Sequence, residues 1–150
     1  METKVIGPLR FPEIPFLDIG EGEWAELSAA LEEATFEVQA YARACEGPGR
    51  LVIVSAAGAA RAIEGCTLEA VGGAFLTTVA QVAAVELAPR GITANVVVPA
   101  RPPDEAVVSV VIGFLGSEAA QGVSGAVIAA DGGFSVSKEV GARPRLPDEH

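Results

Sequence analysis

Apolar side chains recur at alternating steps of three and four residues along two long stretches, which is the period of a helix with one apolar face. The first stretch, residues 22–46, carries a stripe made of Trp24, Leu27, Leu31, Ala34, Val38, Tyr41 and Cys45. The second, residues 66–88, carries a stripe made of Leu68, Val71, Phe75, Thr78, Val82 and Val85. Because the other faces of the second stretch are also apolar, we expect that helix to be covered on two sides, by a sheet and by another helix or chain.

Short, continuous apolar runs alternate with these helices and are typical of strands buried on both faces of a parallel sheet. They lie at residues 51–54, 93–98 and 126–130, and residues 3–6 are a fourth candidate. Residues 106–115 are rich in valine, which favours a strand, but their apolar positions also fit a helix, and Asp104 is a suitable N-cap. We predict a helix there, and an α/β fold with a parallel sheet of three to four strands.

The organisation predicted from these elements is a single domain over residues 1–150. Prolines and glycines in residues 1–21 predict an irregular N-terminal segment, and residues 55–65 predict a loop rich in glycine and alanine. Residues 138–150 predict an extended or disordered tail.

The charge and the scarce residue types exclude several classes of function. A net charge of −10 argues against nucleic acid or an anionic membrane surface as a partner, since both demand a cationic face. Two cysteines, no signal-like N-terminus and no uninterrupted apolar run of about 18 residues lead us to expect a cytoplasmic protein. The single histidine, His150, leaves no material for a metal cluster or a histidine-based triad.

Two segments resemble parts of the short-chain dehydrogenase/reductases. Residues 86–99, ELAPRGITANVVVP, resemble the helix-to-strand segment that follows the active-site helix of that family. Residues 114–133, FLGSEAAQGVSGAVIAADGG, resemble its last helix, last strand and Asp-Gly-Gly turn. The resemblance covers the C-terminal half of a family member, and it implies a truncated Rossmann-like parallel sheet flanked by helices.

The resemblance also implies where catalytic residues should lie. The family's Tyr-x-x-x-Lys pair, counted by the usual spacing, falls on Glu69 and Gly73. Ser55 matches the family's serine, and the position of its asparagine falls near Leu31. Ser55 also suits a structural role at a strand-to-loop turn, and Glu69 suits the first turn of a helix that has no cation nearby. No catalytic residue is therefore assigned, and Ser55 and Glu69 are the only candidates.

Other residues have structural interpretations. Cys66 is expected in the core, because its acidic neighbours would raise its pKa rather than activate the thiol. Gly72 and Gly73 would permit a close approach of their helix to its neighbours. The remaining basic candidates for an anionic ligand are scattered and expected to be solvated: Arg101, Arg143 and Arg145.

Cofactor binding is not expected from this chain alone. The resemblance places the dinucleotide-binding strand and its glycine-rich turn before residue 1, and no G-x-G-x-x-G run occurs in residues 1–50. NAD(P) would enter only through a partner subunit. Residues 99–104 also lead almost directly into the predicted last helix, where the family has a lid over its substrate.

The functional prediction is a non-catalytic subunit that pairs through the helices at 22–46 and 66–88 with a full-length short-chain dehydrogenase, or with itself, to stabilise or regulate its partner. An activity of the isolated chain is not expected. Two alternatives remain: a half-size oxidoreductase that completes its site from a partner chain, and a homodimeric module that binds a small ligand. The partner's identity and substrate are not determined by the sequence.

Overall fold

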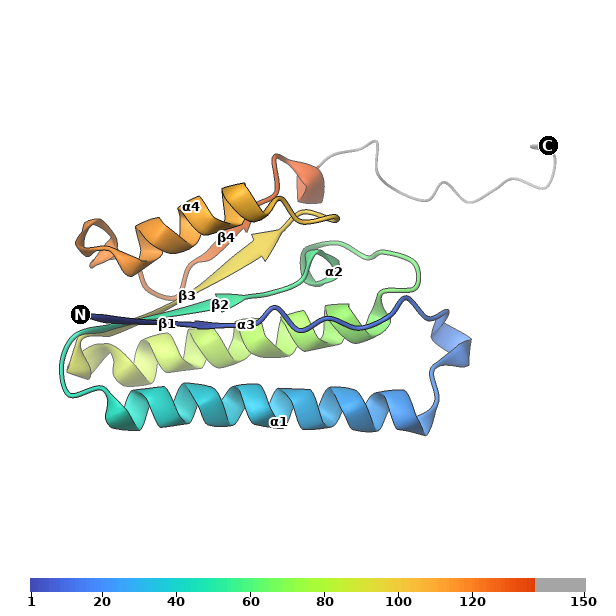
Figure 1. Ribbon diagram of the computed structural model, residues 1–150, viewed down its shortest axis with the longest axis horizontal. Coiled ribbons are helices and arrows are strands. Elements are labelled where there is room, and N and C mark those ends of the chain that lie inside the picture. Colours follow the sequence, from blue (N-terminus) through green and yellow to red (C-terminus); the bar gives the residue numbers. More distant parts are fainter. Residues whose placement is uncertain (137–150) are drawn as a thin grey trace.

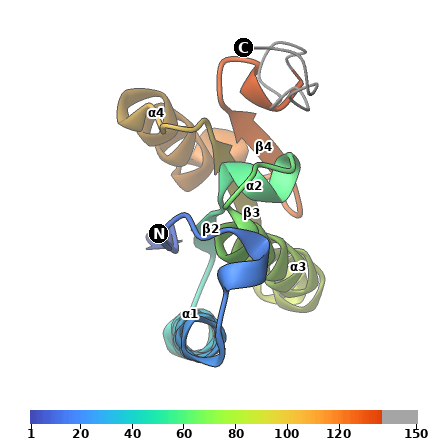
Figure 2. The same cartoon turned by 90° about the vertical axis from the view of Figure 1, so that its right-hand side faces the viewer.

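The computed structural model describes residues 1–136 as a parallel four-stranded sheet between helices (Figure 1). The strands, β1 (Glu2–Ile6), β2 (Gly49–Val54), β3 (Ile92–Pro99) and β4 (Val127–Ala130), lie side by side in chain order. Helices α1 (Glu21–Ala44) and α3 (Thr67–Leu87) cover one face, and α4 (Glu105–Gly116) covers the other (Figure 2). The short helix α2 (Ala57–Ala60) follows β2, and four 3-10 turns complete the fold: Phe16–Asp18, Ala88–Arg90, Glu118–Ala120 and Phe134–Val136.

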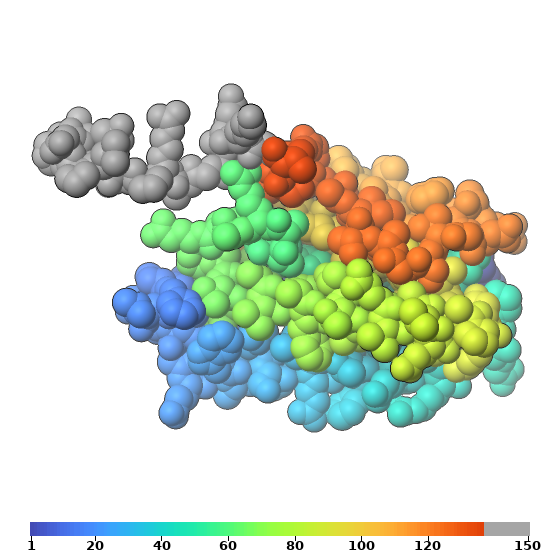
Figure 3. Space-filling model, turned by 180° about the vertical axis from the view of Figure 1, so that it is seen from behind, coloured from blue at the N-terminus to red at the C-terminus, as the bar shows by residue number. Residues whose placement is uncertain are grey.

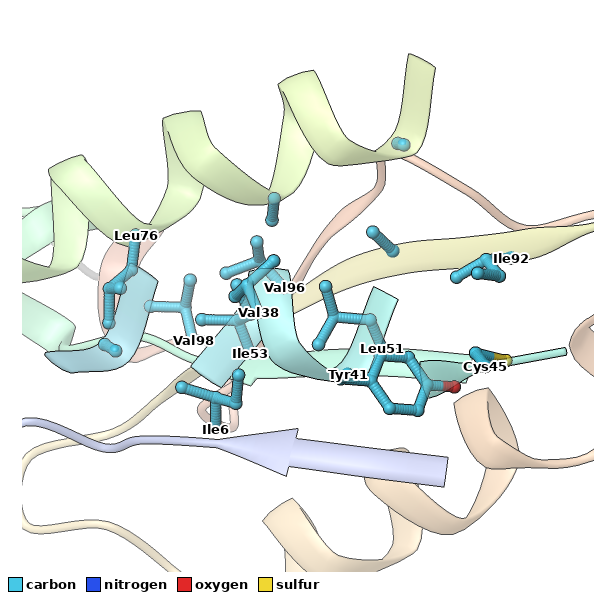
Figure 4. Close-up of a cluster of buried hydrophobic side chains, with 14 residues drawn as sticks. Ile6, Val38, Tyr41, Cys45, Leu51, Ile53, Leu76, Ile92, Val96 and Val98 are labelled. Carbon is cyan, nitrogen blue, oxygen red and sulfur yellow. The ribbon is translucent and has the colours of Figure 1, made fainter. Parts of the chain in front are cut away.

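Two apolar clusters hold the layers together, one on each face of the sheet. Alternate residues of a strand point to opposite faces, so Leu51 and Ile53 of β2 face α1 and α3, whereas Val52 and Val54 face α4. The larger cluster lies under α1 and α3 (Figure 4). Strands β2 and β3 are buried along their whole length, between helices on both faces of the sheet. This burial explains why their sequences are almost continuously apolar.

The predicted fold class is confirmed, and the predicted elements lie close to their expected bounds. The candidate strand at residues 3–6 is β1, and residues 106–115 form most of α4, whose N-cap Asp104 accepts hydrogen bonds from the Ala106 and Val107 amides. Helix α2 lies inside the predicted loop at 55–65 and was missed, because four residues are too short to show a period. The predicted tail, 138–150, lies outside the described residues.

The apolar stripes of α1 and α3 face in opposite directions. In α1 the stripe faces inward, with Leu27 and Val38 buried, although Trp24 at its start is 41% exposed. In α3 the stripe faces mostly outward: Val82 is 50% exposed and Val85 is 75% exposed. The buried face of α3 consists of Leu68, Leu76 and small residues: Gly72, Gly73, Ala80 and Ala84. The outer surface of α3 runs alongside α1 in the space-filling view (Figure 3).

One helix in the described part of the chain, Thr67–Arg90, is long and apolar enough to cross a membrane by length and composition. It packs against β3 and α1, and its small residues lie under the sheet. It is a core helix of the domain, and a core helix passes the same test of length and hydropathy.

Tyr41 joins α1 to the first two strands. Its buried hydroxyl donates a hydrogen bond to the Glu2 carbonyl oxygen at 2.9 Å and accepts one from the Arg50 amide at 2.8 Å. Burial raises the pKa of Tyr41 to about 12. A Cβ at Gly49 would lie 2.3 Å from this hydroxyl oxygen, so the first residue of β2 has to be glycine.

Candidate functional site

The carboxyl ends of β1, β2 and β3 meet at a cavity of about 690 Å³. In open α/β sheets the carboxyl ends of the strands are where ligands bind. The cavity brings together both candidate residues, Ser55 and Glu69, and adds Arg101 from the segment after β3. Much of the remaining wall is apolar and includes Leu9, Phe11, Val54, Pro99, Val108 and Ile112.

Ser55 follows β2 directly and is 2% exposed. Its amide donates to the Val97 carbonyl oxygen at 2.9 Å, which extends the pairing of β2 with β3 by one residue. Its hydroxyl donates to the carbonyl oxygen of Gly73 in α3 at 3.1 Å. The hydroxyl proton is therefore directed at a backbone acceptor, whereas an activated serine nucleophile directs it at a base.

Glu69 lies in the first turn of α3, as predicted, but the expectation that it has no cation nearby is wrong. Arg101 Nη1 lies 2.6 Å from Glu69 Oε2, and Arg101 Nη2 pairs with Glu13 of the N-terminal segment. The hydrogen bond with Glu13 is the largest cause that raises the pKa of Arg101. Glu69 Oε2 therefore accepts a hydrogen bond from Arg101, and the guanidinium occupies the side of the carboxylate that faces the cavity wall.

Arg101 itself was predicted to be solvated, and that prediction is also wrong. Its side chain is only 27% exposed, because it lines the cavity and its guanidinium pairs with Glu13 and Glu69. The guanidinium joins two segments that are 56 positions apart in the chain, at Glu13 and Glu69. This ion-pair network lies at the cavity where the resemblance implies a catalytic tyrosine. Arg143 and Arg145 lie outside the described residues.

Gly73, at the position of the family's lysine, has no space for a side chain. A Cβ there would lie 2.6 Å from Ser55 Oγ, 2.8 Å from Ala59 Cβ and 3.0 Å from the Ala56 amide nitrogen. The close approach expected of Gly73 is therefore confirmed. Leu31, near the position of the asparagine, lies on α1 with its Cδ2 at 3.9 Å from a Cβ placed on Gly72, so it belongs to the packing between α1 and α3.

Cys66 is buried immediately before α3, as predicted. Burial is the largest cause that raises the pKa of the Cys66 thiol, Arg101 opposes the shift, and Glu69 adds to it. A thiol of raised pKa is a poor nucleophile at neutral pH. No group of three or more His, Cys, Asp or Glu side chains within residues 1–136 is placed to hold a metal ion.

Sequence reasoning found Ser55 and Glu69 but missed that Glu13 and Arg101 complete the same site. The sequence could have predicted that both residues lie near this cavity. Each follows a strand of a parallel sheet, and the carboxyl ends of such strands meet at one edge. Their pairing could not be predicted, since nine other residues besides Arg101 are basic and nineteen others besides Glu13 are acidic.

Comparison with solved structures shows the fold that the sheet order suggests. A short-chain dehydrogenase/reductase from Serratia marcescens is matched with a TM-score of 0.81 and 23% identity, over 89% of this chain and 65% of that protein. The acetoin dehydrogenase YohF from Salmonella typhimurium is matched with a TM-score of 0.79 and 17% identity, over 97% of this chain and 67% of that protein.

A third solved structure, the promiscuous reductase LugOII, is matched with a TM-score of 0.80 and 22% identity, over 89% of this chain and 62% of that protein. The chain thus spans about two thirds of the length of these proteins. No family model and no curated protein matches the sequence. The chain has the Rossmann-like fold of the short-chain dehydrogenase/reductases.

Proposed function

We propose that this chain is a non-catalytic, cytoplasmic subunit that pairs through the outer faces of α1 and α3 with a full-length short-chain dehydrogenase, and that it stabilises or regulates that partner. The observation that carries the proposal is the outward orientation of the α3 stripe. Four large apolar residues spaced along α3 are between 39% and 75% exposed: Val71, Phe75, Val82 and Val85.

Such a surface favours a docking role over a solvated one. Soluble proteins seldom expose contiguous apolar patches of more than a few hundred Å², and larger patches mark interaction sites. Apolar positions at steps of three and four are also the spacing with which helices pack on one another. Ala74 and Thr78 lie exposed between the large residues, so the patch has no charged side chain at its centre.

The geometry of the strand-end cavity supports the non-catalytic part of the proposal. The hydroxyl of Ser55 is used in a bond to Gly73, Glu69 is paired with Arg101, and Gly73 leaves no space for a lysine. Three of the four positions that the resemblance makes catalytic thus have a role in packing or charge pairing.

Assembly is tested by co-expression of the chain with the full-length short-chain dehydrogenase encoded nearest to it, followed by native mass spectrometry. We expect a complex that contains both chains, and we expect Ala40→Glu and Ala74→Glu to dissociate it. Both alanines are exposed, on α1 and α3 respectively, so these substitutions leave the core intact. Ala119→Glu, at an exposed position away from both helices, is the matched control. A soluble 15.3 kDa monomer under all conditions contradicts the proposal.

Cofactor binding is tested separately by titration calorimetry of the isolated chain with NAD and with NADP at millimolar concentration. We expect no saturable heat, because no strand in the described residues is followed by a G-x-G-x-x-G turn that opens a helix. An isotherm with one site per chain would instead favour a half-size oxidoreductase.

A second candidate function is a homodimeric module for a small ligand, favoured by the cavity of about 690 Å³ with its largely apolar wall. It predicts self-association without recruitment of any dehydrogenase. The same mass spectra therefore separate the two candidates, since they report the composition of each complex.

A further inference from the structure

The outer face of α1 carries a narrow apolar seam. Ala25, Ala29, Phe36 and Ala40 follow one another at steps of four, seven and four residues, so they align on one side of the helix. All four are exposed, and Phe36 is 57% exposed. This side is opposite the one that Leu27 presents to the core, and no other element of the described structure covers it.

Glutamates flank the seam. At 3.6 residues per turn, Glu32 falls on one side of it and Glu26, Glu33 and Glu37 fall on the other. Of these four glutamates, only Glu37 forms an ion pair within residues 1–136, to Lys4 at 2.8 Å. The seam and its flanks form a surface hollow lined by Ala29, Glu32, Glu33, Phe36, Glu37 and Ala40.

This charge pattern disfavours a second copy of the chain as the occupant. Helix α1 contains six glutamates and one arginine, Arg43, so an α1–α1 contact would place two strongly acidic surfaces together. Like charges across an interface oppose association and are a common means of rejecting the wrong partner. The net charge of −10 adds a repulsion of the same sign at longer range.

We propose that the outer face of α1 docks a helix of a different chain, one that fills the seam with apolar side chains and flanks them with lysine or arginine. This inference rests on the function proposed above and specifies the partner's chemistry. Small alanines let a partner helix approach closely, Phe36 supplies the apolar anchor, and the glutamates select the basic partner.

The outer face of α3 contributes area without this selectivity. Helix α3 contains two charged residues: Glu69 lines the strand-end cavity and is paired with Arg101, and Glu86 lies in the last turn. A neutral apolar face tolerates a second copy and a different chain equally. The choice of partner is therefore made on α1.

The experiment uses the full chain as its own probe. In the variant E26K/E32K/E33K three exposed glutamates of α1 become lysines, which have nearly the same helix propensity, so the fold is retained. We expect this variant to form a one-to-one heterodimer with the wild-type chain in sedimentation and native mass spectrometry. Phe36→Glu in the wild-type partner should abolish that heterodimer, and raising the salt from about 0.05 to 0.5 M should weaken it about tenfold.

The matched control is E2K/E64K/E118K, which changes the net charge by the same amount at exposed sites outside α1. We expect its affinity for the wild-type chain to be at least about tenfold lower than that of the α1 variant, because only the α1 lysines meet the acidic seam. Equal recruitment by both variants would mean that net charge alone drives association. A wild-type homodimer that Phe36→Glu dissociates would make the second copy the occupant. Either result overturns the inference.

Failure of this inference is distinguishable from failure of the proposed function. If the complex with the dehydrogenase is lost in Ala40→Glu but unaffected by E26K/E32K/E33K, the subunit function stands and the charge selection is wrong. If no dehydrogenase complex forms at all, the subunit function is wrong, whatever the charge variants do with each other.

Discussion

Helices α1 and α3 have the same apolar period and lie against the same face of the sheet, yet they present opposite sides to it. Helix α1 buries most of its stripe of large residues, and its outer face carries alanines, Phe36 and several glutamates. Helix α3 buries mainly glycine and alanine and leaves most of its stripe outside. A periodic apolar stripe thus predicts a helix with an apolar face, but it does not predict whether that face packs on the sheet of the same chain.

The difference follows from how the two helices meet. Helix α3 lies close to the sheet, where Gly73 faces Ser55 and a larger residue would collide. Helix α1 packs on α3, where the Leu27 and Leu31 side chains lie over Gly72. The face of α3 that consists mainly of glycine and alanine therefore packs against both the sheet and α1. The larger residues of its stripe remain on the surface. Three pairs of substitutions test this account.

The largest effect is expected from truncation of corresponding stripe residues on the two helices. Leu27→Ala on α1 removes a side chain that is 2% exposed, and we expect it to lower the free energy of unfolding by about 2–5 kcal/mol. Val82→Ala on α3 removes one that is 50% exposed, and we expect a change within about 0.5 kcal/mol. Urea denaturation measures both, and equal losses would mean that the α3 stripe is a core face.

A smaller effect is expected from adjacent glycines of α3. Gly73→Ala forces a Cβ against Ser55 and Ala59, and overpacking of this kind costs about 1–3 kcal/mol. Gly72→Ala is the control, because its Cβ would first meet Leu27 Cδ1 at 3.4 Å, an ordinary contact, and alanine adds up to about 1 kcal/mol of helix propensity. Thermal and chemical unfolding measure the difference.

The same clash governs any attempt to restore the dehydrogenase residues. Glu69→Tyr with Gly73→Lys should give a less stable protein and no cofactor-dependent turnover above that of the parent. Turnover in this double variant would contradict the proposal that the chain acts without chemistry of its own.

The smallest effect is expected at the ion pairs that tie the start of α3 to the cavity. Arg101→Met leaves Glu69, 16% exposed, without its cation, and we expect a loss of about 1–2 kcal/mol, less than for a fully buried pair. The control is Arg10→Met, whose pair with Glu105 is exposed and contributes at most about 0.5 kcal/mol.

The pH dependence of the Arg101 effect has a defined sign. The raised pKa of Arg101 stabilises the fold at every pH below its unfolded-state value, and that contribution is lost only at a pH above it. The difference in unfolding free energy between the parent and Arg101→Met should therefore be the same at pH 6 and pH 9. A difference that falls over this range would assign the effect to another group.

Local pattern and spacing were sufficient for the elements of this protein. The two long helices, the buried strands β2 and β3 and the Asp104 cap were predicted because each depends on neighbours in sequence, through a period, a run or a single turn. The positions of Ser55 after a strand and of Glu69 in the first turn of a helix were predicted in the same way, from neighbouring sequence.

Only the tertiary structure decided how those elements are used. The α3 stripe faces outward because the space between helix and sheet at Gly73 admits no side chain. The ion-pair partner of Glu69 is Arg101, which lies 32 positions away in the chain. Both are properties of surfaces brought together by folding. A sequence fixes the period of a helix through its own backbone geometry, whereas the side that is buried depends on which neighbour offers the closer fit.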